Sequence, residues 1–138
     1  CRRHGLKVHG FFVIGLPWET RETLEECYQF AKALDPDFFD FNIAYPLPGT
    51  EFYEIAKNDG LFELPDPKEG GYAVAAVRTY SLSSQELTEW RRRALLRMYS
   101  RPRYVMRMLR HAAATGNTRH YARAAMQRVA SLLNLTGA

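Results

Sequence analysis

The sequence predicts an α/β protein of the barrel type, because a strand, a Pro/Gly loop and a helix occur twice in that order. In the first unit, a β-rich stretch over 7–14 is followed by Gly15-Leu16-Pro17 and a helical pattern over 20–34. In the second, residues 38–45 precede the turn over 46–50 and a short helix over 51–58. Such units build a ligand-binding rim at the carboxyl ends of barrel strands. We therefore expect the two loops to lie together at one rim.

The first unit shows how each element is specified. Its strand is nearly continuous in apolar residues, which predicts burial on both faces, as in parallel sheets. Thr20 can cap the next helix, and Glu19 and Glu22 lie near its positive end. Asp35-Pro36-Asp37 ends that helix. The helix face expected to pack on the sheet contains Leu24, Cys27, Tyr28, Ala31 and Leu34.

The second strand alternates in polarity. Phe39, Phe41, Ile43 and Tyr45 share one face, whereas Asp40, Asn42 and Ala44 share the other. In a barrel the apolar face would meet the outer helices and the polar face would look into the lumen. Lumens are usually filled by branched apolar residues, so Asn42 and Ala44 suggest space kept for a ligand. A half-exposed strand whose polar face meets water explains the alternation equally well.

The C-terminal part of the sequence is helical and strongly basic. All 15 acidic residues lie within 1–89, whereas 90–138 hold 11 arginines, no lysine and no acid. We therefore divide the chain into an α/β part at 1–80 and a basic helical extension at 81–138. The remaining elements are a loop over 61–71, an extended segment over 72–80, a helix from the Ser83-x-x-Glu86 capping box to Tyr99, and helices over 102–114 and 118–133.

Several classes of protein lack support in the sequence. Cys1, Cys27 and the four histidines show no metal-ligand or triad spacing, so we expect no metal site and no catalytic group in this chain. No P-loop, dinucleotide fingerprint, nucleophile elbow, membrane span or secretory leader is present. A cytosolic setting is the default for so few cysteines. Because the chain opens on Cys1, we expect a segment of a longer polypeptide, with the upstream part as its partner.

Two further features allow more than one interpretation. Glu19 could hold a positive or hydroxylated ligand group, although stabilising the helix start is the simpler explanation. The arginine-rich helices could dock on the acidic upstream part of the same enzyme, which we favour. A peripheral contact with an anionic membrane surface or a carboxylate-bearing substrate ranks second, and nucleic acid ranks last.

Three segments carry a family resemblance. The stretch over 9–20 (HGFFVIGLPWET), Leu34-Asp-Pro-Asp, and the stretch over 44–53 (AYPLPGTEFY) resemble the last third of radical S-adenosylmethionine (SAM) enzymes. The most similar branch has an N-terminal cobalamin-binding domain and includes anaerobic magnesium-protoporphyrin IX monomethyl ester oxidative cyclases and hopanoid methylases. The match covers residues 5–60, and the stretches over 81–87 and 99–104 are similar to that branch's tails.

The resemblance implies a fold and a parent activity. The fold would be the C-terminal strands and helices of a partial (β/α)6 TIM-like barrel, followed by an all-helical C-terminal extension. The parent would be a radical SAM Fe–S oxidoreductase or methyltransferase that uses S-adenosylmethionine, a [4Fe–4S] cluster and, in this branch, cobalamin, with a small, lipophilic substrate. The family's Cys-x3-Cys-x2-Cys loop is not in this chain, so the cluster ligands would lie upstream and the segment alone would be inactive.

The family pattern also assigns the cofactor-binding residues. Val13, two residues before Gly15, would lie against the adenine, and the backbone at about 44–46 would hold its edge. Glu19 would be the acidic residue of the pattern, displaced by one position. The expected set is therefore Val13, Gly15, Glu19, Asn42, Ala44, Tyr45 and Pro46. The competing hypothesis is a non-catalytic module whose basic helices bind nucleic acid or a membrane surface.

Overall fold

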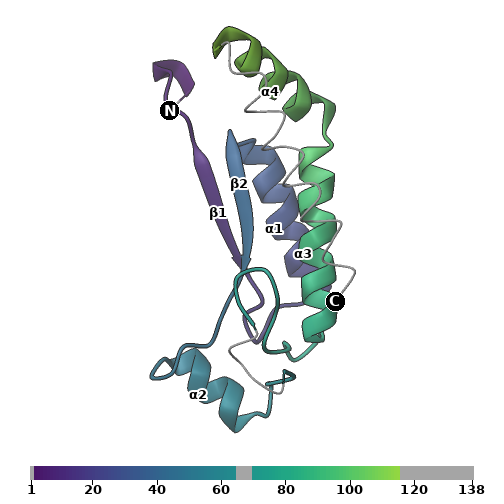
Figure 1. Cartoon of the computed structure of the whole chain (residues 1–138). Coiled ribbons are helices and arrows are strands. Elements are labelled where there is room, and N and C mark those ends of the chain that lie inside the picture. Colours follow the sequence, from purple (N-terminus) through teal and green to yellow (C-terminus); the bar gives the residue numbers. More distant parts are fainter. Residues whose placement is uncertain (1, 65–69, 116–138) are drawn as a thin grey trace. The chain divides into compact units, whose positions relative to one another are not determined.

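A computed structural model describes residues 2–64 and 70–115 (Figure 1). The chain forms two compact units, and the boundary between them lies between Arg91 and Arg92. The predicted helix over 118–133 lies outside the described residues. In chain order the elements are the 3-10 helix η1 (Arg2–His4), β1 (His9–Ile14), α1 (Arg21–Leu34), β2 (Phe38–Ile43), α2 (Glu51–Asn58), α3 (Ser84–Tyr99) and α4 (Pro102–Thr115).

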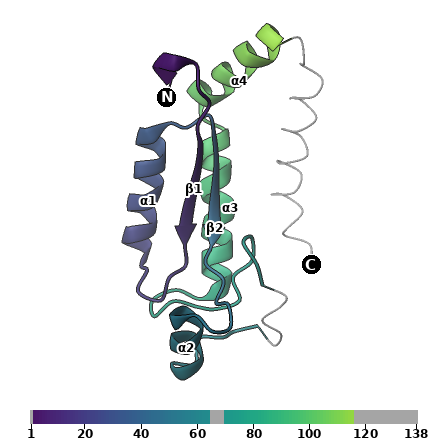
Figure 2. The ribbon, with the colours of Figure 1, turned by 90° about the vertical axis from the view of Figure 1, so that its left-hand side faces the viewer.

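The first unit is built on two parallel strands. β1 and β2 pair from His9–Phe38 to Ile14–Ile43. α1 connects the end of β1 to the start of β2 and runs alongside the sheet (Figure 2). The predicted order of strand, loop and helix is therefore confirmed for both strand–loop–helix repeats, although each strand is two residues shorter than expected.

The core of this unit lies on one face of the sheet. Phe12 and Ile14 of β1 are buried there, as are Phe39, Phe41 and Ile43 of β2. The ring of Trp90 meets that of Phe41 edge-on, with centroids 5.6 Å apart. α1 contributes Leu24, Tyr28 and Ala31 to the buried set. The predicted apolar face of β2 is thus confirmed.

Two packing predictions are wrong. β1 is not buried on both faces, because the side chains of Phe11 and Val13 are 64% and 60% exposed. Among the described residues the sheet has two strands. The buried residues of α1 and Trp90 pack on the face opposite Phe11 and Val13. Leu34 is also 55% exposed rather than part of the α1 packing face. It is the last residue of α1, and Asp35 turns the chain with φ 46° directly after it.

The predicted helix caps are confirmed. The Thr20 hydroxyl accepts from the N–H of Thr23, whose own hydroxyl accepts from the Thr20 N–H at 3.0 Å. The Thr50 hydroxyl caps α2 by accepting from the Tyr53 N–H at 3.3 Å. At the start of α3, Ser83 N–H donates to the Glu86 carboxylate at 3.0 Å and Ser83 Oγ accepts from Glu86 N–H at 3.2 Å. A cap of this kind stabilises a helix by about 1 kcal/mol.

The second unit contains the end of α3 and all of α4. The Tyr99 and Tyr104 rings meet edge-on with centroids 5.5 Å apart, and the Arg107 guanidinium lies 5.4 Å from the Tyr104 ring centre. Tyr104 and Ala112 are the buried residues of α4. Val105, Met106 and Leu109 of the same helix are exposed. These contacts define which side of α4 packs and which side faces outward.

Candidate cofactor-binding rim

The exposed face of the sheet brings predicted site residues together. Val13 is the register partner of Asn42, and because side chains alternate along strands, both lie on the face opposite the buried core. Ala44 follows two residues later and is half-buried, as is Asn42. These three residues form a small shelf, apolar at Val13 and polar at Asn42, at the carboxyl end of the sheet.

The opposite end of the same face carries a different pair. His9 Nε2 lies 3.0 Å from Asp40 Oδ2, and the His9 ring stacks on Phe11 at 4.1 Å between centroids. His9 is exposed and sits at the first residue of β1. His9 is therefore a surface histidine remote from the rim.

Gly15 directly follows β1 and has a backbone conformation that strongly favours glycine over residues with a Cβ. Its φ is +85°, and a Cβ built on it would lie 3.1 Å from Ile43 Cγ2 and 3.7 Å from Leu87 Cδ1. Gly15 is buried, so its observed role is to let the end of β1 pack closely against β2 and α3. Its N–H donates to the Glu19 carboxylate.

Glu19 forms hydrogen bonds with the backbone of the first loop. Its carboxylate accepts from the backbone of Gly15, and its own N–H donates to the Leu16 carbonyl at 3.0 Å. Burial raises the pKa of Glu19 above 4.5, and hydrogen bonds from the Gly15 and Leu16 backbone partly offset that rise. The observed geometry therefore shows Glu19 stabilising the loop as well as lying next to the helix cap.

The second loop is anchored by backbone bonds and by proline packing. Ala44 N–H donates to the Ile14 carbonyl at 2.7 Å, which extends the strand pairing by one residue. Pro46 and Pro17 are both fully buried. Since Ala44 N–H is engaged and Pro46 has no N–H, a ligand here would contact carbonyl oxygens or the neighbouring Tyr45, which is half-buried.

A segment over 70–83, for which the sequence predicts a loop and an extended stretch, joins the two loops. The Tyr72 carbonyl accepts from Ile43 N–H at 3.0 Å, and Tyr80 N–H donates to the Pro17 carbonyl at 2.8 Å. The segment also pairs with the residues that follow α2, through the isolated antiparallel bridge between Phe62 and Val77. Its Ala-Val-Ala-Ala-Val run over 73–77 is the only sequence feature that indicates its burial. It fixes both loops at the strand ends.

Arg91 has a structural role that its sequence context did not reveal. Its Nε donates to the Phe41 carbonyl at 2.5 Å. Phe41 and Ile43 direct their backbone groups to the edge of β2 away from β1, because Ala44 N–H faces β1. Arg91 and Tyr72 therefore occupy the outer edge of β2.

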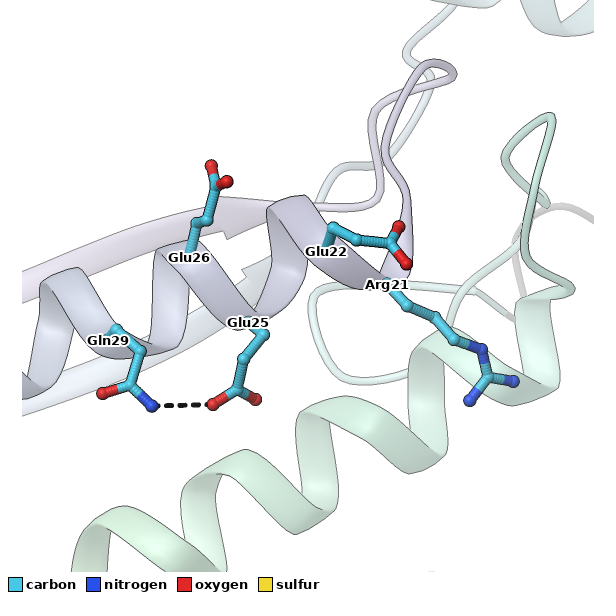
Figure 3. Close-up of a pocket in the computed structure, with 5 residues that line it drawn as sticks. All are labelled: Arg21, Glu22, Glu25, Glu26 and Gln29. Carbon is cyan, nitrogen blue, oxygen red and sulfur yellow. Dashed lines mark hydrogen bonds between the residues drawn. The ribbon is translucent and has the colours of Figure 1, made fainter.

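Other features of the described residues add no second site. A surface hollow on α1 is lined by acidic and polar side chains, where Gln29 Nε2 donates to Glu25 Oε1 at 2.8 Å (Figure 3). In the described ranges, no three His, Cys, Asp or Glu side chains gather closely enough to hold a metal ion.

The comparisons with known proteins give two relatives. At 32% identity over 107 residues, the chain is similar to the uncharacterized methyltransferase PH0819 of Pyrococcus horikoshii; the match covers 78% of this chain and 23% of that protein. At 33% identity over 66 residues, it is similar to a bacteriochlorophyllide d C-8(2)-methyltransferase of Chlorobaculum tepidum, covering 48% of this chain and 15% of that enzyme. No family model matches the sequence. The chain thus spans under a quarter of each relative, and both relatives carry the name methyltransferase.

Proposed function

We propose that this chain is the C-terminal part of the cofactor-binding barrel of a radical SAM enzyme of the methyltransferase type. The observation that carries the proposal is the shelf of Val13, Asn42 and Ala44 at the carboxyl end of two parallel strands, bounded by two Gly/Pro loops. The names of the two relatives support the methyltransferase part. The motifs over 9–20 and 44–53 support the radical SAM part.

The shelf suits the adenosyl group of S-adenosylmethionine. The exposed Val13 side chain offers apolar surface to a flat ring, and the Asn42 amide offers a donor and an acceptor to its polar edge. Gly15 and Glu19 would act indirectly, by keeping the loop beside this surface in one conformation. Ala44, Tyr45 and Pro46 would line the other side through their backbone.

The edges of the sheet support a larger barrel. The outer edge of β2 is occupied by Arg91 and Tyr72, so β2 would be the last strand. β1 pairs only with β2 among the described residues, and His9, Phe11 and Val13 direct their backbone groups to its other edge. We propose that strands of the upstream polypeptide join there. This placement gives the partial (β/α)6 barrel and puts the shelf in its lumen.

The remaining chemistry would come from groups held elsewhere in the protein. A [4Fe–4S] cluster supplies the electron that cleaves S-adenosylmethionine, and cobalamin in this branch supplies a methyl carrier. This chain's contribution is to bind and orient the adenosyl group and to exclude water from it. We propose a lipophilic substrate, in keeping with the bacteriochlorophyllide named for one relative.

Asn42 provides a direct test of the adenosyl site. We expect Asn42→Ala to weaken S-adenosylmethionine binding by the intact protein about tenfold, the equivalent of one lost hydrogen bond to a ligand (about 1.5 kcal/mol). Asn58→Ala is the matched control, because Asn58 is exposed at the end of α2 and distant in sequence from the shelf. Equilibrium dialysis under anoxic conditions measures both affinities. Equal affinities for the two variants would contradict the proposal.

The competing module hypothesis has its own signature. If the basic helices bind nucleic acid, the affinity for DNA should fall steeply and linearly with the logarithm of salt concentration. Such binding, together with no cluster and no cleavage of S-adenosylmethionine in the reconstituted full-length protein, would replace the enzyme proposal with the binding module.

A further inference from the structure

In the part of the chain that the structure describes, α4 presents an exposed apolar face. Val105, Met106 and Leu109 are 40%, 50% and 59% exposed. Their spacing of one, three and four residues places them on one side of the helix, and Ala113 continues that side one turn later. Tyr104 and Ala112, which are buried, lie on a different side. The apolar face is therefore directed outward rather than toward the Tyr99–Tyr104 contact.

One flank of this apolar face is basic. Arg103 and Arg110 lie within one turn of Met106 on the same edge of the helix, and both are exposed. No acidic residue occurs from residue 90 to the last residue, so the sequence around α4 carries positive charge alone. All of these cations are arginines, whose planar guanidinium matches phosphate oxygens in pairs.

We propose that α4 lies in the interface of an anionic lipid bilayer, with Val105, Met106 and Leu109 inserted and Arg103 and Arg110 on lipid phosphates. A bilayer surface offers apolar depth and negative charge together, which is the combination that this helix presents. α4 has 14 residues and none of the described helices is long and apolar enough to cross a membrane. It would therefore lie along the surface. This inference goes beyond the proposed cofactor site and does not depend on it.

Vesicle sedimentation of the intact protein tests the inference. We expect binding to vesicles of mixed phosphatidylglycerol and phosphatidylcholine, and at least about tenfold weaker binding to phosphatidylcholine alone. Leu109→Asn should lower the partition coefficient on anionic vesicles roughly tenfold or more, because one inserted leucine is lost. Leu34→Asn is the matched control, since Leu34 is similarly exposed on α1. Arg110→Gln should reduce binding to anionic vesicles by about fivefold, and added salt should also reduce that binding.

Hydrogen exchange then locates the contact. Amides over 102–115 should gain protection when anionic vesicles are added, and those of α1 should not. The inference is overturned if the intact protein ignores the vesicles, if Leu109→Asn and Leu34→Asn bind equally, or if neutral and anionic vesicles bind alike. Protection of 102–115 without vesicles, by an acidic region of the protein itself, would also overturn it.

Discussion

Replacing Gly15 by alanine should destabilise the sheet by a strain term and a packing term that the structure separates. The strain term comes from φ +85°, which costs a non-glycine residue about 1–2 kcal/mol. The packing term comes from the new Cβ, which would lie 3.1 Å from Ile43 Cγ2 on a fully buried side chain. Forcing that contact costs about another 1 kcal/mol. We therefore expect a total of about 2–3 kcal/mol.

Gly49 gives the matched control. Its φ is +87°, but a Cβ built on it meets no atom within 4 Å, so Gly49→Ala carries only the strain term. Native-state hydrogen exchange at the β1 and β2 amides would measure the local free energy of opening in both variants. We expect Gly15→Ala to cost about 1 kcal/mol more than Gly49→Ala. Equal costs would refute the close packing of Gly15 against Ile43.

Three further predictions concern the rim and the edge of the sheet. Because the pKa of Glu19 is raised on folding, its contribution to stability is present below pH 4.5 and is lost as pH rises through the folded-state pKa. As pH rises through that range, the free energy of unfolding should therefore fall less in Glu19→Gln than in the unsubstituted protein. Parallel pH profiles for the variant and the unsubstituted protein would contradict this. Arg91→Met should cost about 1–3 kcal/mol by leaving the Phe41 carbonyl without its donor, whereas Lys32→Met, at an exposed position on α1, should stay within about 0.5 kcal/mol in denaturant titrations. Thr50→Ala should cost about 1 kcal/mol by removing the cap of α2, seen as faster hydrogen exchange over 51–58, and unchanged exchange would show that the cap contributes nothing.

The sequence predicted the local architecture well because local chemistry determines it. Thr20 and Thr50 cap their helices through their own hydroxyls, and the alternation over 38–43 assigns the faces of β2 before any packing is known. The prediction failed for β1, where a continuous apolar run suggested two buried faces. Phe11 and Val13 are exposed. An apolar strand is buried on both faces only where other elements cover both, and no described element covers the face that carries these two side chains.

The candidate site was predicted in part. Val13, Asn42 and Ala44 were each proposed. The alternation of the second strand already placed Asn42 and Ala44 on one face, and the strand register, which the sequence alone did not reveal, brings Val13 to the same face. Glu19 was assigned either to a ligand or to the helix start, but its partner is Gly15 N–H, four residues earlier in the same loop. Arg91 and Tyr72 were missed at the sheet edge. Their contacts span 50 and 29 residues, and no local pattern specifies pairings at such distances.

The exposed Val13 side chain tests the central claim most directly. In the full-length protein, purified without oxygen, reconstituted with iron and sulfide and reduced with dithionite, 5′-deoxyadenosine formation from S-adenosylmethionine reports cofactor binding and cleavage together. Val13→Asp should lower the rate at subsaturating cofactor by about tenfold or more, because a carboxylate would replace the apolar contact with adenine. Leu34→Asp, at a similarly exposed site on α1, should leave the rate unchanged. Equal rates for the two variants, or no 5′-deoxyadenosine from the unsubstituted protein, would contradict the account.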